Sequence, residues 1–233
     1  MNRILSPLRK AVDDYGMIEA GDKIAVGVSG GKDSGTLLFA LERLRQFYPK
    51  SFSLIAVIID LGTSMNYTPL LEILERNGIP WVQKKTRISE LVFDVRKEKN
   101  PCSMCAVLRR GALNQTAKEI GANKVALGHH LDDVLETFLL NLIHGGRLGC
   151  FQPVTYLDRM DLKVIRPLIY TEEKEIRACV RRLRIPVIEN PCPANGNTQR
   201  QEMKFLLQTL EQQYPGVRKR IFGAMKRSGL DHW

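Results

Sequence analysis

The stretch VGVSGGKDSGTLL, residues 26–38, constrains the fold of this chain more than any other. A β-branched run, KIAVGVS, leads into two adjacent glycines, and the apolar residues of GTLLFALERLRQFY then recur at helical spacing. The stretch therefore predicts a strand, a tight turn and a helix in direct succession. Glycines allow the turn and let the backbone approach a ligand closely, while the free amides at the start of the helix attract anions.

The same alternation continues along the chain. Strand patterns at SLIAVIID, IPWVQKK and KVALG are separated by helical patterns at LLEILERNG and residues 102–120, and DDVLETFLLNLIH follows as a further helix. Because parallel strands need crossover connections, this order predicts an α/β fold with an open, doubly wound parallel sheet over residues 21–170. Residues 1–20 are expected to hold an N-terminal helix, and residues 171–233 a basic, helical C-terminal extension.

The charge balance points to a polyanionic partner. The net charge is +10, of which +6 falls in residues 151–233. Such an excess favours nucleic acid through phosphate neutralisation, although an ordinary basic surface gives the same count. No apolar run approaches the roughly 20 residues of a membrane span, and the N-terminus lacks the apolar core of a secretory signal. We therefore expect no membrane partner and a cytoplasmic location.

Five cysteines, an odd number in a sequence with no recognisable secretion signal, argue against a disulfide framework. Cys102 and Cys105 have C-x-x-C spacing at the start of a predicted helix, where thiolates bind metal or react. The spacing alone fits a redox pair, a zinc half-site or an iron-sulfur half-site. Cys192, in ENPCPANGN, is the nearest further thiol that could join this pair in one site. We interpret Cys179 as a core residue and Cys150 as an incidental loop thiol.

The glycine-rich turn departs from the phosphate loop of nucleotide hydrolases. Asp33 follows Lys32 where that loop needs a hydroxyl for magnesium, and Val26 stands where its first glycine should be. SGGKDS resembles instead the signature of the PP-loop ATP pyrophosphatases, in which a nucleophile attacks the α-phosphorus of ATP and pyrophosphate leaves. The resemblance implies that the turn binds ATP, with Asp33 associated with the phosphates and their Mg²⁺. The binding residues are then Ser29, Gly30, Gly31, Lys32, Asp33 and Ser34.

A wider resemblance covers most of the chain. PCSMCAVLRRG, KVALGHHLDDVLETFLLN, VIRPLIY, and NPC followed by QRQ resemble the tRNA 2-thiocytidine synthetase family. This resemblance implies an ATP- and iron-sulfur-dependent tRNA sulfurtransferase. Such an enzyme adenylates the C2 carbonyl of a cytidine at anticodon-loop position 32, replaces the oxygen with sulfur, and releases AMP and pyrophosphate.

The resemblance also implies cofactors and partners. A 4Fe-4S cluster would be held by Cys102, Cys105 and Cys192, with one iron left open for the sulfur to be transferred. The family's third-cysteine segment often has a second cysteine, and Glu189 stands in its place here. Expected partners are tRNA, a cysteine desulfurase or other sulfur donor, and a second copy of the chain in a homodimer.

Further residues are assigned to the site. Asp133 in GHHLDD is the predicted base, because such catalysis needs a positioned proton acceptor, and the neighbouring carboxylate is free to cap the helix. Arg109, seven residues after Cys102 on one helical face, is predicted to reach the ATP phosphates. Gly128 would let the backbone approach the nucleotide, and Ile58 in the second strand is also placed among the cofactor-binding residues.

Other interpretations remain open at this stage. His129 and His130 either contact phosphate, support the cluster or are structural. The chain could be a thiolase for another tRNA base such as uridine, although those relatives usually carry extra zinc-binding C-x-x-C pairs that are missing here. It could also be a redox or regulatory protein that binds ATP and a cluster without catalysis. A lysidine-type ligase has no use for three cysteines.

The position of Asp33 generates a first prediction. With labelled ATP and unmodified tRNA, the products should be AMP and pyrophosphate, because the turn lacks the hydroxyl that holds magnesium for γ-phosphate cleavage. Chromatography of the labelled nucleotides checks this. ADP and phosphate as the main products would contradict the PP-loop interpretation.

Overall fold

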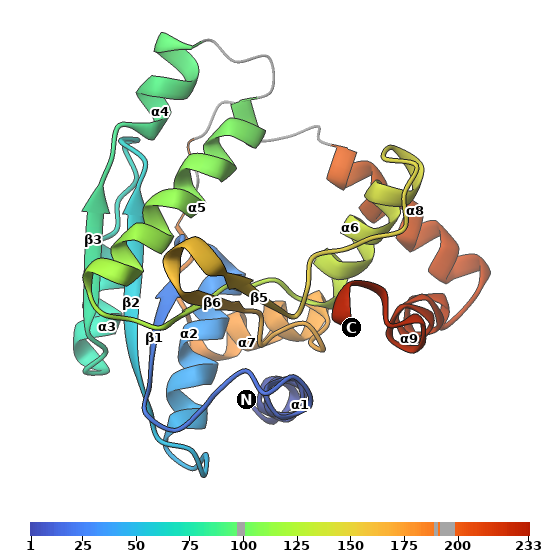
Figure 1. Cartoon of the computed structure of the whole chain (residues 1–233), viewed down its shortest axis with the longest axis horizontal. Helices are drawn as coiled ribbons and strands as arrows, with labels where there is room; N and C mark the ends of the chain where they lie inside the picture. Colours follow the sequence, from blue (N-terminus) through green and yellow to red (C-terminus); the bar gives the residue numbers. More distant parts are fainter. Residues whose placement is uncertain (97–100, 189–190, 192–198) are drawn as a thin grey trace.

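The computed structural model describes residues 1–96, 101–188, 191 and 199–233. At its centre lies a six-stranded sheet with the order β3-β2-β1-β4-β6-β5 (Figure 1). Neighbouring strands run parallel, except that β5 pairs antiparallel with β6. This confirms the predicted α/β class with a doubly wound sheet. The strands are β1 (Asp22–Gly27), β2 (Phe52–Asp60), β3 (Trp81–Lys85), β4 (Lys124–Ala126), β5 (Val154–Leu157) and β6 (Leu162–Ile165).

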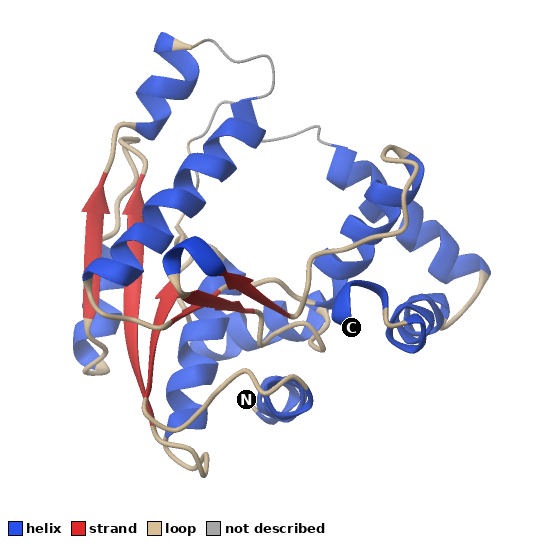
Figure 2. Ribbon diagram, in the orientation of Figure 1, coloured by secondary structure: helices blue, strands red, loops and turns tan. Residues whose placement is uncertain are grey.

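Helices connect and cover these strands (Figure 2). A short helix followed by a π-helical turn, and the hairpin of β5 and β6, were not predicted as separate elements. The helices are α1 (Asn2–Asp14), α2 (Lys32–Arg45), α3 (Thr68–Arg76), α4 (Ile88–Glu90) with the π-helical turn η1 (Leu91–Val95), α5 (Pro101–Glu119), α6 (Leu131–Ile143), α7 (Glu173–Leu183), α8 (Gln199–Gln213) and α9 (Val217–Ser228), with 3-10 turns η2 (Asp158–Met160) and η3 (Leu230–His232).

The two faces of the sheet bury different helices. Successive residues of a strand point to opposite faces, so Ile24 and Val26 of β1 pack with α1, α2 and α7, whereas Ala25 packs with α4 and α5. Figure 1 shows α5 across one face, with α2 and α7 behind the sheet. None of the helices described is long and apolar enough to cross a membrane.

The C-terminal helices form a separate packing layer with α6. Leu135 and Leu139 of α6 pack against Met203 and Leu207 of α8, and α9 lies beside them (Figure 1). The chain end returns to the main core, where Trp233 is buried. The extension over residues 171–233 therefore packs closely against the sheet domain.

The start of α7 is capped from another helix. Its N-cap is Glu172, whose side chain makes no capping hydrogen bond. The Glu173 amide instead donates to Oδ2 of Asp132 on α6, at 2.7 Å. Cys179 is buried on the inner face of α7, in agreement with its interpretation as a core residue.

Several basic residues of the extension have partners within the molecule. Arg218 donates to Oδ1 of Asp132, and Arg220 donates to the carbonyl of Pro215 at 3.1 Å. Lys226 contacts the Tyr170 hydroxyl and lies 3.5 Å from Oδ2 of Asp14. These residues anchor α9, so their charges are not all available to an external polyanion.

The contact of Arg218 with Asp132 generates a stability prediction. Arg218→Gln should destabilise the fold by about 1–3 kcal/mol, because it leaves a largely buried carboxylate without its charged partner. A chain of this size loses about 2–4 °C in Tm for each kcal/mol. Lys219→Gln is the matched control, since Lys219 is exposed and makes no ion pair within the described residues. Equal Tm values for the two variants would contradict the anchoring role.

Candidate active site

The glycine-rich turn, residues 29–34, follows β1 at the carboxyl edge of the sheet and includes Lys32, Asp33 and Ser34 at the start of α2. Gly30 has φ of 82°, a left-handed conformation that a side chain disfavours. Gly31 is the N-cap of α2 and offers no side-chain acceptor to the first amides of the helix. These amides are therefore suited to an anionic ligand.

The two serines of the turn fix its shape. The Ser29 amide donates to Oγ of Ser34 at 3.1 Å, and the Ser34 hydroxyl donates to the carbonyl of Gly31 at 3.1 Å. The Ser29 and Ser34 hydroxyl oxygens are 3.2 Å apart. These hydroxyls therefore stabilise the turn, and their contact with ATP stays a prediction.

Lys32 and Asp33 carry opposite charges at the start of α2. Nζ of Lys32 lies 2.9 Å from Oδ2 of Asp33 and 3.1 Å from Oε1 of Glu173 on α7. Burial acts to lower the pKa of Lys32, but the hydrogen bonds and charges of these carboxylates outweigh it and raise the pKa. Lys32 is therefore a fixed cation beside the uncapped amides.

The loop GHHLDD between β4 and α6 packs directly on the glycine-rich turn. A Cβ on Gly128 would lie 3.0 Å from the backbone of Asp33 and of Ser34. The missing side chain thus makes room for the neighbouring turn, and the predicted approach of Gly128 to the nucleotide stays a prediction. Two loops predicted to bind ligand therefore lie in contact at one edge of the sheet.

His130 lies between the carboxylates of these two loops. It is the N-cap of α6, and its Nδ1 accepts a hydrogen bond from the Asp133 amide at 3.4 Å. Nε2 lies 3.5 Å from Oδ1 of Asp33 and 3.5 Å from Oδ2 of Asp133. Oδ1 of Asp33 is buried and has no hydrogen-bond partner within the described residues, so a polar ligand atom can be accommodated there.

Asp132 and Asp133 have different partners. Oδ2 of Asp133 accepts from the His130 amide at 2.9 Å and completes a capping box, while its Oδ1 lies 3.8 Å from Arg200. Asp132 points to α7 and α9, as described above. Asp133, the predicted base, therefore caps α6 and is joined to the turn through His130, and its catalytic role stays a prediction.

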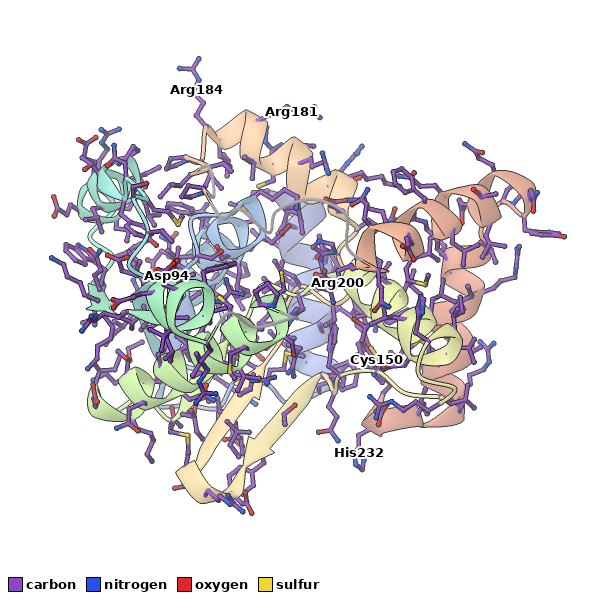
Figure 3. The ribbon with its side chains drawn as sticks, turned by 90° about the horizontal axis from the view of Figure 1, so that it is seen from above. Asp94, Cys150, Arg181, Arg184, Arg200 and His232 are labelled. Carbon is purple, nitrogen blue, oxygen red and sulfur yellow. The ribbon has the colours of Figure 1, made fainter. Side chains whose placement is uncertain are left out.

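Glu136 was not singled out in the sequence, although it lies one helical turn after Asp133. Its side chain is buried and lies 3.7 Å from Nε of Arg200, whose Nη2 donates to Thr137 at 3.0 Å. Arg200, labelled in Figure 3, thus joins α8 to α6 beside the GHHLDD loop. Burial, and then the charge of Asp133, raises the pKa of Glu136 to about 7, while the charge of Arg200 opposes the shift.

His129 is held as a neutral imidazole. Its ring stacks on Phe151 with centroids 4.8 Å apart, and the guanidinium of Arg166 covers the same phenyl ring at 5.1 Å. Burial, and then the charge of Arg166, lowers the pKa of His129 to about 4. Its Nδ1 is buried without a hydrogen-bond partner in the part of the chain described here.

Two predicted cluster ligands lie in the first turns of α5. Cys102 is exposed and Cys105 is half-buried, and no disulfide joins the described cysteines. Thiols at this helix end are suited to bind metal as thiolates. Cys192 and Glu189 lie outside the described residues, and no group of three metal-binding side chains converges within the described ones.

The chain before Cys192 is nevertheless attached to the glycine-rich turn. The Ile188 amide donates to the carbonyl of Gly30 at 2.9 Å. A Cβ on Gly30 would lie 3.0 Å from the Ile188 side chain. A Cβ on Gly35 would lie 2.9 Å from the Ile185 side chain, so both glycines make room for this segment. The described chain therefore reaches the glycine-rich turn at Ile188.

Arg109 and Arg110 both lie in α5. Burial raises the pKa of Tyr67, the charge of Asp60 adds to the shift, and the charge of Arg109 opposes it. The predicted contact of Arg109 with the ATP phosphates stays a prediction. Burial lowers the pKa of Arg166 to about 10, and the charge of Arg110 contributes to the shift.

Ile58 follows Val57, which pairs with Gly27 at the end of β1. Its side chain is fully buried in the core, and its contact with the nucleotide stays a prediction. The Cys150 thiol, labelled in Figure 3, donates to the carbonyl of Val134 at 3.4 Å. Burial raises the pKa of Cys150 to about 12, so this thiol is protonated at neutral pH, which supports its interpretation as an incidental thiol.

The sequence of the chain is similar to known proteins. The PP-loop domain family matches residues 3–210. The tRNA-cytidine(32) 2-sulfurtransferases of Cupriavidus necator and Haemophilus influenzae are each 41% identical to the chain over 99% of its length, covering 74% and 77% of those proteins.

Two solved structures have a similar fold. The U34-tRNA thiolase NcsA from Methanococcus maripaludis, with its 4Fe-4S cluster, superposes with a TM-score of 0.78 and 26% identity, covering 97% of this chain and 78% of that one. The NH3-dependent NAD synthetase from Campylobacter jejuni has a TM-score of 0.53 and 14% identity, covering 94% of this chain and 86% of that one. The latter likeness concerns the fold alone.

The raised pKa of Glu136 generates a pH prediction. A carboxyl whose folded pKa exceeds its unfolded value costs stability as the pH rises from about 4.5 to 7. Glu136→Gln should therefore raise Tm by about 2–4 °C at pH 8 and leave it nearly unchanged at pH 4. Scanning calorimetry at both pH values tests this, with the exposed Glu202→Gln as control. An equal gain at both pH values would contradict the assigned cause.

Proposed function

The chain belongs to the tRNA-cytidine(32) 2-sulfurtransferase family of PP-loop proteins, and we propose that it thiolates cytidine in tRNA at the expense of ATP. The observation that carries the proposal is the glycine-rich turn. It presents uncapped helix amides, the fixed cation Lys32 and the carboxylate of Asp33 against the GHHLDD loop. This arrangement is suited to a nucleotide whose pyrophosphate is the leaving group.

The proposed reaction has two steps. The C2 carbonyl oxygen of the cytidine attacks the α-phosphorus of ATP, and pyrophosphate leaves from the turn. A sulfur atom then forms a bond to C2, the bond from C2 to oxygen breaks, and AMP departs with that oxygen. Within the chain, Lys32 and the α2 amides bind the pyrophosphate oxygens, Arg109 stabilises charge that develops at phosphorus, and Asp133 accepts the proton of the sulfur nucleophile.

Cys102, Cys105 and Cys192 are the proposed ligands of a 4Fe-4S cluster. When bound, the cluster supplies an iron at which the sulfur for transfer can be held. Two observations fit this assignment: the paired thiols at the start of α5, and the attachment of Ile188 to Gly30 four residues before Cys192. Thiolates are the ligands such clusters require.

The tRNA backbone is proposed to bind the extension at cations that make no ion pair within the described residues. Arg181 and Arg184 project outward from the end of α7 in Figure 3, and Lys219 and Arg227 are exposed on α9. A target base in a single-stranded loop can be splayed out into a site at low cost. We further propose a cytoplasmic location, a homodimer, and a cysteine desulfurase or other sulfur donor as partner.

The cluster assignment generates a prediction about the five cysteines. Replacing any one of Cys102, Cys105 or Cys192 by Ala should abolish thiolation and lose or destabilise the cluster, because its properties follow its ligands. Iron content and visible absorbance of anaerobically purified protein, and tRNA nucleoside analysis, provide the measurements. ATP should still bind, because the glycine-rich turn is a separate element.

The other two thiols are the controls. Cys150→Ala and Cys179→Ala should keep the iron and the activity, since both thiols pack inside the protein. Full iron content and activity in Cys192→Ala, with loss of both in Cys150→Ala, would show that the third ligand is misassigned.

A further inference from the structure

Glu173 binds three cations at the start of α7. Its Oε1 lies 3.1 Å from Nζ of Lys32 and 2.8 Å from Nη2 of Arg177, and its Oε2 lies 2.7 Å from Nζ of Lys204 on α8. The side chain is only 12% exposed. Neither the sequence motifs nor the proposed reaction assign it a role.

We propose that Glu173 is a positioning residue that aims the Lys32 ammonium at the phosphates of the bound nucleotide. This inference rests on the proposed function, since it requires ATP to bind the glycine-rich turn. On this proposal α7 contributes to nucleotide binding through Glu173, in addition to the glycine-rich turn.

The donor count of Lys32 supports the proposal. An ammonium group has three N–H donors on a flexible stem. Asp33 and Glu173 lie 2.9 Å and 3.1 Å from Nζ of Lys32, so among the described residues one donor remains for a ligand. Because the stem is already ordered, nucleotide binding does not have to immobilise it.

Glu173 is itself held in place from several sides. Its amide donates to Asp132 on α6, and Lys204 and Arg177 contact its carboxylate. A carboxylate in the first turn of a helix is also stabilised by the helix dipole. Burial acts to raise the pKa of Glu173, but the hydrogen bonds from Lys204, Arg177 and Lys32 outweigh it and lower the pKa to about 2. The group is therefore ionised at physiological pH.

The opposite role is the main competitor. If Glu173 competed with phosphate for Lys32, its removal would free the ammonium and strengthen ATP binding. Positioning predicts weaker binding instead. The sign of the change in ATP affinity thus separates the two roles.

A double-mutant cycle measured by calorimetric titration of ATP tests the proposal on the full chain. Glu173→Gln should weaken ATP binding about tenfold, because the neutral amide no longer holds the charged lysine. Lys32→Ala should weaken binding at least as much, and the double variant should bind no worse than Lys32→Ala. The KM for tRNA should stay unchanged.

Glu175→Gln is the matched control, because Glu175 lies on the same helix and pairs with Arg3 of α1 instead. It should bind ATP like the wild type. Tighter or unchanged binding in Glu173→Gln, or losses that add fully in the double variant, would overturn the inference while leaving the proposed function intact. Failure of the wild-type protein to bind ATP would overturn both.

Discussion

The carboxylate of Asp132 joins three elements that are far apart in the sequence. It accepts the first amide of α7 and binds Arg218 of α9, while its own helix begins at the GHHLDD loop. This junction sets where α7 begins, and α7 in turn brings Glu173 to Lys32. The geometry of the nucleotide site therefore depends on a carboxylate that faces away from the nucleotide.

Two loops at the carboxyl edge of the sheet share one network. His130 spans Asp33 and Asp133, and Gly128 allows the backbones of the loops to touch. Such close contact leaves little freedom for the charged groups, which agrees with chemistry that depends on preorganised charge. Glu136 and His129 lie just behind this network. Burial keeps His129 neutral and leaves Glu136 partly protonated near neutral pH.

Much of the fold could be predicted because strand and helix periodicities are local. The turn at SGGKDS and the helix from Pro101 were recognisable in this way. The four-residue strands β5 and β6 were not recognised as a hairpin, although the three-residue strand β4 was recognised in KVALG. The cap of α7 comes from Asp132, 41 residues earlier, so no local signal exists for it. Likewise Arg218 lies in a basic run, but its partner is set by tertiary packing.

The central claim is that the chain adenylates the C2 oxygen of a tRNA cytidine and replaces it with sulfur. The most direct test uses tRNA whose target cytidine carries heavy oxygen at C2, with mass spectrometry of the AMP and of the modified nucleoside. The account predicts heavy oxygen in AMP and a thionucleoside that has lost the label. Heavy oxygen retained in the base, or AMP without the label, would contradict it.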